Sequence, residues 1–299
     1  MMRFEFIDRH REKFEINIMC QVLQVSKSGY YAWRKRAASQ REIANQQLFN
    51  DIQRVFHENR QVYGAVRIWK ALHKEGIKCG RDRVARLMKD NKLRCKRPKR
   101  RFVTTKADKS KRPAPNLLDQ QFDATAPDKK WCSDITYIPT DEGWLFLAVT
   151  LDLYSRKVVG WAMDRTITAQ LVCSAYQMAL AQRKPAPGLI HHSDRGSQYT
   201  SYDFQNLMTH SKAQASMSAK GNCYDNAVSE SFFATLKTEL VPNNGYEKRS
   251  IGRGDIFTYI EGFYNRKRLH SSIGYHSPEE YEAIYWENQS IGMASSQVH

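Results

Sequence analysis

The chain has 299 residues, of which 41% are hydrophobic and 26% charged, so its composition is that of a globular protein rather than a disordered, collagenous or disulfide-rich one. The length favours two domains. No apolar run reaches the roughly 18 residues of a spanning helix, and the first residues lack the apolar core of a secretory signal, so we expect an intracellular protein. The 6 cysteines form no CxxC pair, which argues against a zinc site and a disulfide framework.

The net charge is unevenly distributed. The whole chain carries +16, yet residues 1–112 hold 30 basic and 11 acidic residues, a net +19, whereas residues 113–299 hold 17 and 20, a net −3. This asymmetry predicts that the N-terminal third faces a polyanion. Nucleic acid is the favoured partner, because Lys and Arg contacts to phosphate supply most of non-specific binding. A merely basic, soluble surface is the alternative.

Residues 41–95 show helical periodicity in three stretches, with turns near Gly64 and Gly80. This pattern predicts a helix-turn-helix-like DNA-binding domain, although any small helical bundle would look similar. Residues 1–40 contain a helix, a serine cap at Ser26 and an aromatic helix, and we interpret them as an N-terminal helical extension.

Residues 96–126 are interpreted as a basic linker. From Lys92 to Arg112, 11 of 21 residues are Lys or Arg, with almost no apolar side chain to pack a core. Such a segment either follows a duplex backbone or is a solvated tether. The candidate DNA contacts here are Lys96, Arg97, Lys99, Arg100 and Arg101.

Residues 127–245 change to strand patterns. The second of the predicted strands is almost continuously apolar, as is typical of a central strand buried on both faces. The predicted strands are 131–138, 143–152, 156–163, 188–193 and 215–218, and the helices lie around 171–179, 204–208 and 226–240. The order βββαβαβα predicts an α/β fold with a mixed, ribonuclease-H-like sheet. The remaining residues, 246–299, are interpreted as a C-terminal helical tail.

Three acids lie where this sheet would bring them together. Asp134 is in the first strand, Asp194 ends the fourth, and Glu230 begins the last helix. Gathered carboxylates repel one another unless a cation holds them, and hard oxygen ligands suit Mg²⁺ or Mn²⁺. Two such ions support phosphodiester chemistry. Each acid also has a structural interpretation, and Asp152 and Asp225 compete for the same roles.

Four motifs resemble those of the DDE transposases of the insertion sequence three family, relatives of retroviral integrases. They are WCSDITYI (131–138), HHSDRGSQY (191–199), KGNCYDNAVSESFF (220–233) and YNRKRLHSSIGY (264–275). The resemblance implies that Asp134, Asp194 and Glu230 form the catalytic, metal-binding triad. It also implies DNA contacts at Lys220 and at Lys237, two helical turns after Glu230, although a solvated lysine is the alternative there.

The resemblance further implies a DNA transposase that cleaves phosphodiesters at element ends and transfers the freed 3′-hydroxyl, with no covalent protein intermediate. The implied partners are element-end and target DNA, a first-reading-frame protein of the element and further copies of the chain, in a bacterial cytoplasm near the nucleoid. A metal-dependent nuclease and a non-catalytic DNA-binding regulator are the rival functions. The chain departs from the family pattern at Ala219, where a basic residue is expected, and at Gly252 and Gly254.

Overall fold

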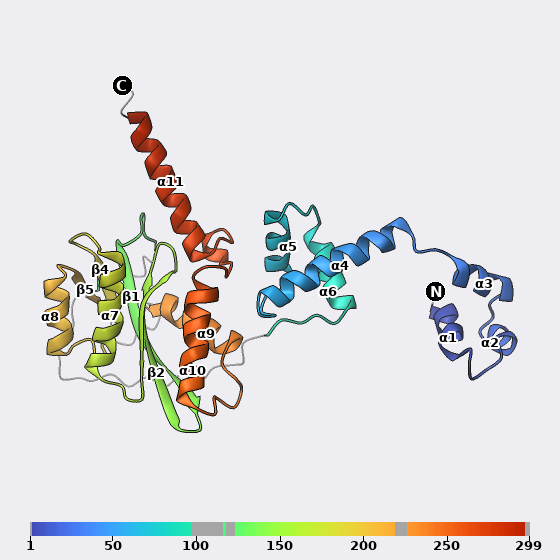
Figure 1. The fold of residues 1–299 in the computed structure, drawn as a ribbon, viewed down its shortest axis with the longest axis horizontal. Coiled ribbons are helices and arrows are strands. Elements are labelled where there is room, and N and C mark those ends of the chain that lie inside the picture. The colour runs from blue at the N-terminus through green and yellow to red at the C-terminus, as the bar shows by residue number, and fades with distance from the viewer. Residues whose placement is uncertain (1, 97–115, 118–122, 219–225, 297–299) are drawn as a thin grey trace.

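The computed structural model describes residues 2–96, 116–117, 123–218 and 226–296, and Figure 1 shows their arrangement. The chain begins with three short helices, α1 (Met2–His10), α2 (Ile16–Val22) and α3 (Lys27–Lys35). They enclose a small core of their own that includes the fully buried Tyr30. The Ser26 hydroxyl caps α3 by accepting from the Gly29 amide, as the sequence predicts. This unit lies at the far end of the molecule from the sheet (Figure 1).

The second unit contains the three predicted helices, α4 (Gln40–Glu58), α5 (Ala65–Lys74) and α6 (Arg81–Asp90). A reciprocal capping box starts α4, because the Ser39 hydroxyl accepts from the Glu42 amide and the Glu42 carboxylate accepts from the Ser39 amide. Apolar side chains at helical spacing then meet in the centre of the unit. Those buried include Leu48, Ile52, Phe56, Ile68, Leu72, Val84 and Leu87.

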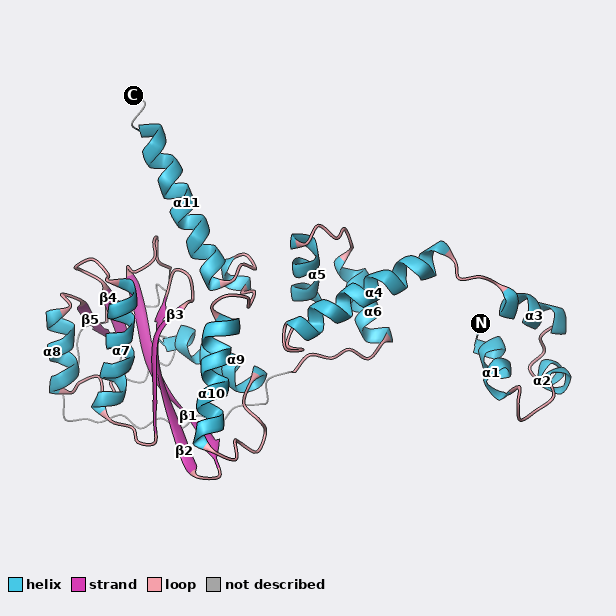
Figure 2. Cartoon of the chain, viewed as in Figure 1, coloured by secondary structure: helices cyan, strands magenta, loops and turns pink. Residues whose placement is uncertain are grey.

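The predicted mixed α/β sheet is confirmed, with five strands in the order β3-β2-β1-β4-β5 (Figure 2). The strands are β1 (Lys130–Thr140), β2 (Gly143–Asp152), β3 (Val158–Asp164), β4 (Ile190–Ser193) and β5 (Gln214–Met217). The first three are antiparallel, whereas β4 pairs parallel to both β1 and β5. The side chains of β2 are buried on both faces of the sheet, with Leu147 in one core and Ala148 in the other, which explains the lack of alternation in its apolar run.

Helices cover both faces of the sheet. Helices α7 (Ala169–Arg183) and α8 (Tyr202–His210) bury one face around Trp131, Tyr176 and Phe204. The other face packs against α9 (Ala227–Glu239) and α10 (Arg249–Phe257). The sheet is therefore the middle layer of three, and both carboxylate-bearing strands, β1 and β4, lie near its centre.

Most residues after 245 are helical, and α10 packs against β2, whereas the C-terminal helix projects away from the sheet (Figure 1). A π-helical segment (Thr258–Tyr264) follows α10, then a 3-10 turn (Ser271–Ile273) precedes α11 (Pro278–Ser296). Gly252 explains how α10 approaches so closely, because a Cβ there would lie 3.1 Å from the Tyr246 ring and 3.3 Å from Leu145. Among the described residues, no helix combines the length and apolarity that crossing a bilayer requires.

The α4–α6 unit contacts the segment that follows α10. The Tyr63 hydroxyl donates to the Lys267 carbonyl at 3.0 Å and accepts from the Leu269 amide at 2.8 Å. Arg67 Nε donates to the Leu269 carbonyl at 2.9 Å, and Lys74 pairs with Glu280 at 2.6 Å. These contacts connect segments that lie about 200 residues apart in the sequence. Side chains of both units belong to one continuous buried cluster.

Candidate active site

Two of the three predicted acids belong to adjacent strands, one within β1 and the other directly after β4. In the β1–β4 pair, Cys132 is opposite His192, and Asp134 and Asp194 each follow two residues later. Because the two strands are parallel, Asp134 and Asp194 occupy equivalent positions toward the same end of the strand pair. Asp194 comes directly after the carboxyl end of β4, the usual position of ligand sites in open α/β sheets.

Each of these carboxylates is oriented by a nearby backbone amide. Asp134 Oδ1 accepts from the Ile135 amide at 2.8 Å, and Asp194 Oδ1 accepts from the Gly196 amide at 2.9 Å. Burial, reinforced by the negative charges of Asp194 and Glu230, raises the pKa of Asp134 well above its ordinary value. Burial also raises the pKa of Asp194, against the opposing effect of the Gly196 amide. The site therefore disfavours negative charge unless a cation enters.

Glu230 is more exposed than the two aspartates. It lies in the first turn of α9, the helix that packs against β1, and its charge contributes to the raised pKa of Asp134. Among the described residues, no three His, Cys, Asp or Glu side chains lie close enough to hold one metal ion. The structure thus brings Asp134 and Asp194 together, with Glu230 within electrostatic reach of Asp134 but outside a closed three-ligand cluster.

Lys237 lies on the side of α9 that faces β1. Its ammonium is 4.6 Å from the centre of the Tyr137 ring, a cation–π distance. Its positive charge lowers the pKa of Asp134, in opposition to burial. Lys237 is therefore half-buried beside the acidic site rather than extended into solvent.

The neighbouring polar residues of the motifs have structural contacts. His191 Nε2 bonds to the Ser133 hydroxyl at 2.8 Å, and burial lowers the pKa of His191 to about 3. His192 bonds through Nδ1 to the Ser216 hydroxyl in β5, and through Nε2 to the hydroxyl of Ser218, the first residue after β5. Asp152 is fully buried and accepts from the Asp128, Tyr154 and Ser155 amides. These bonds fix the β2–β3 turn, so Asp152 has a structural role.

Tyr199 was not singled out in the sequence. Its side chain is 1% exposed, and its hydroxyl has no hydrogen-bond partner among the described residues. Burial raises the pKa of Tyr199 well above its ordinary value, and the charges of Asp134 and Asp194 raise it further. Its position five residues after Asp194, in the HHSDRGSQY motif, is the signal that points to it.

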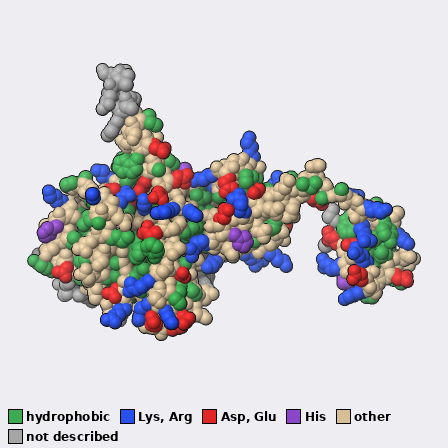
Figure 3. Space-filling view, viewed as in Figure 1, with side chains coloured by type: hydrophobic (Ala, Val, Ile, Leu, Met, Phe, Trp, Pro, Cys, Tyr) green, Lys and Arg blue, Asp and Glu red, His purple; other side chains and the backbone are tan. Residues whose placement is uncertain are grey.

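Most of the predicted DNA contacts lie outside the described residues, namely Arg97, Lys99, Arg100, Arg101 and Lys220, as do Ala219 and Asp225. Lys96 is described, and its ammonium donates to the Glu239 carbonyl at 3.0 Å. That carbonyl is at the C-terminal end of α9, where a cation is favoured. Figure 3 shows Lys and Arg side chains over both the helical units and the sheet domain.

Three family models match this chain. An HTH-like domain matches residues 43–101, and two integrase core domain models match residues 124–223 and 230–284. The HTH-like match includes most of α4 and all of α5 and α6, and the integrase matches include the sheet, both aspartates and most of α9.

Curated relatives match nearly the whole chain. The transposase InsF for insertion sequence IS3A of Escherichia coli is 42% identical over 283 residues, which are 94% of this chain and 98% of that protein. An uncharacterized 31 kDa protein of insertion element IS600 of Shigella sonnei is 44% identical, covering 89% and 98%. Among solved structures, the HTLV-2 integrase catalytic core in complex with magnesium is 17% identical with a TM-score of 0.40, covering 53% and 98%. The BIV integrase catalytic core is 18% identical with a TM-score of 0.38, covering 56% and 99%.

Proposed function

The chain belongs to the family of IS3 insertion-sequence transposases, and we propose that Asp134, Asp194 and Glu230 are its catalytic carboxylates. It is a DNA transposase of the DDE polynucleotidyl transferase class, with an integrase core and an HTH-like domain. One observation carries the proposal for the site: burial and like charge on adjacent strands raise the pKa of Asp134. A carboxylate whose pKa is perturbed in this way is typical of functional sites.

A divalent cation fits this donor set. The half-buried Asp134 and Asp194 carboxylates repel each other's charge, and their oxygens are the hard ligands that Mg²⁺ and Mn²⁺ prefer. Asp134, Asp194 and Glu230 would hold two such ions. Bound there, the metal would supply Lewis-acid stabilisation of the attacking and leaving oxygens of a phosphodiester.

The proposed reaction consists of two in-line displacements. In the first, a water oxygen bonds to phosphorus at the element end and the 3′-oxygen leaves as a hydroxyl. In the second, that 3′-hydroxyl bonds to another phosphorus and displaces a second 3′-oxygen. The first transfer would join one element end to the other and give a circular intermediate. Lys237, beside Asp134 in the structure, would contact the DNA next to the cleaved phosphate.

The finer assignments are also proposals. The partners would be element-end and target duplexes, a first-reading-frame protein of the same element, and further copies of this chain, because two DNA ends must be paired. Residues 41–95 would bind DNA, residues 96–126 would connect that domain to the catalytic core at 127–245, and residues 246–299 would form the C-terminal part. The site of action would be the bacterial cytoplasm, near the nucleoid.

The test uses the whole chain and a labelled element-end duplex with Mg²⁺ or Mn²⁺. We expect cleavage and joined products from the wild type and no products from Asp134→Asn or Glu230→Gln. Asp141→Asn is the matched control, since Asp141 is an exposed acid just after β1, and it should remain active. Cleavage without joining would favour the nuclease, and equal DNA binding without chemistry in all proteins would favour the regulator.

A further inference from the structure

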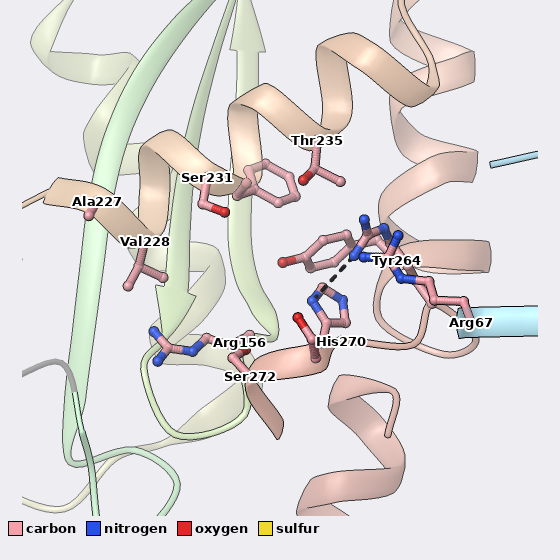
Figure 4. A pocket seen from close by; sticks show the side chains of 12 residues that line it. Arg67, Arg156, Ala227, Val228, Ser231, Thr235, Tyr264, His270 and Ser272 are labelled. Carbon is pink, nitrogen blue, oxygen red and sulfur yellow. Dashed lines mark hydrogen bonds between the residues drawn. The ribbon is translucent and has the colours of Figure 1, made fainter. Parts of the chain in front are cut away.

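A cavity of about 320 Å³ lies beside α9, away from Asp134 and Asp194. Its walls come from α9, from α5 of the HTH-like domain, from the β2–β3 turn and from the segment after α10 (Figure 4). This volume is at the lower end of the range for small-molecule sites. The polar lining residues are Arg67, Arg156, Ser231, Thr235, Tyr264, Arg268, His270, Ser271 and Ser272.

The cavity is positively charged. Among the residues that the structure describes, three arginines and no acidic side chain line it. Arg268 is neutralised by a bidentate pair with Glu239, whose carboxylate lies outside the lining. Arg67 and Arg156 form no ion pair with any acid in the part of the chain that the structure describes. Arg67 and Arg156 therefore add two positive charges to the cavity wall that no contacting carboxylate of the described residues neutralises.

Two of the donors that line the cavity have no acceptor. Arg156 Nη1 and His270 Nε2 are both buried without a hydrogen-bond partner among the described residues. His270 Nδ1 lies 3.4 Å from Arg268 Nη1 and must accept there, because a guanidinium has donors only. Burial, followed by the charges of the three arginines, lowers the pKa of His270 to about 2, so the ring is neutral. Its proton is consequently on Nε2, which makes that orphan atom a donor.

We propose that this cavity binds a phosphate group, which would be a backbone phosphate of the DNA substrate. The orphan donors, the two guanidinium groups without an ion pair and the hydroxyls of Ser231 and Thr235 all match an anion with several acceptor oxygens. The claim that the phosphate belongs to DNA rests on the proposed function, whereas the claim that the cavity binds a phosphate group rests on the cavity alone.

The location gives such a phosphate a positioning role. Ser231 and Thr235 are one turn apart on α9, so they share a face that differs from that of Glu230. Arg67 belongs to the HTH-like domain, and Arg156 belongs to the β2–β3 turn, where it has a φ of 64°. One phosphate would thereby connect the DNA-binding domain, the sheet and the helix that carries Glu230.

Two measurements on the whole chain test the proposal, each with wild type, Arg156→Gln and the control Arg165→Gln, an exposed arginine just after β3. The first is thermal stability in sodium phosphate against sodium chloride at equal ionic strength. The second is the salt dependence of the dissociation constant for an element-end duplex. Thr235→Val is nearly isosteric with the native residue and removes one cavity hydroxyl. It provides a second test of the cavity if Arg156→Gln does not fold.

We expect phosphate to raise the melting temperature of the wild type and of Arg165→Gln, less so that of Thr235→Val, and not that of Arg156→Gln. In Arg156→Gln, the slope of log K against log salt should fall by about 0.9, the value for one lost phosphate contact. Phosphate stabilisation with an unchanged DNA slope would assign the site to a free phosphate group. Equal phosphate effects and equal slopes in all four proteins would overturn the proposal. Neither measurement needs cleavage, so failure of the catalytic assignment would be seen separately.

Discussion

Glu239 holds the C-terminal end of α9 to the segment after α10 through a buried ion pair. Its carboxylate, 7% exposed, accepts from Arg268 Nη2 at 2.6 Å, from Arg268 Nε at 2.9 Å and from the Tyr259 hydroxyl at 2.6 Å. Glu239→Gln removes the charge and turns an amide donor toward a guanidinium that also only donates. Arg268 is 4% exposed, so its charge would stay buried without a partner. Breaking such a pair costs about 3–5 kcal/mol of unfolding free energy.

Thermal unfolding of the whole chain measures this loss. We expect the melting temperature of Glu239→Gln to fall by about 6–20 °C, given about 2–4 °C per kcal/mol for a unit of this size. Glu247→Gln is the control, because Glu247 pairs with Lys248 at 4.0 Å with both side chains more than half exposed. Such surface pairs contribute about 0–1 kcal/mol. A Glu239→Gln protein that melts with the control would refute the argument that this pair fixes the end of α9.

Three further outcomes are expected. Because burial raises the pKa of Asp134 in the folded chain, Asp134→Asn should stabilise the metal-free chain by about 1.4 kcal/mol for each pH unit by which that pKa exceeds 3.8. This gain is present at pH 8 and is lost below pH 3.8, where the aspartate is protonated in both states. Urea unfolding in EDTA measures it, and equal gains at pH 8 and pH 3.5 would contradict the argument. The pKa of His191 is lowered to about 3, so the unfolded chain alone binds its proton below pH 6.5, and stability falls as pH falls. His191→Gln should therefore flatten that decline by about 1.4 kcal/mol per pH unit, as seen by urea titration at pH 7 and pH 5. Tyr63→Phe leaves the Lys267 carbonyl and the Leu269 amide unpaired, at a cost of about 1–3 kcal/mol of unfolding free energy. Hydrogen exchange in α5 should therefore accelerate. The control, Tyr31→Phe, changes a residue that is 36% exposed and should leave the exchange rate in α5 unchanged.

Local pattern was sufficient to predict the fold class. Period-2 and apolar runs locate the strands, and the helix predicted at about 226–240 corresponds to α9. The integrase-type core was also predictable, because its motifs are long and the family matches confirm it. The catalytic assignment of Asp134, Asp194 and Glu230 stays a prediction.

Long-range packing was not predictable from local pattern. A glycine inside a helix costs about 1 kcal/mol relative to alanine, yet the missing Cβ of Gly252 is what lets α10 approach Leu145 and Tyr246. Gly254 faces open space, and nothing in the structure explains it. The orphan hydroxyl of Tyr199 and the arginine-lined cavity likewise depend on residues far apart in the sequence, which no periodicity connects.

The contacts of Tyr63 and Arg67 with residues 267–269 have a consequence for how the chain is divided. The HTH-like domain is joined to the integrase core once covalently, through residues 96–126, and a second time through these hydrogen bonds, which are partly or fully buried. A break in the covalent connection therefore leaves the second attachment in place. Two polypeptides, ending and starting within residues 97–115, should associate when they are co-expressed, as the halves of a split protein do.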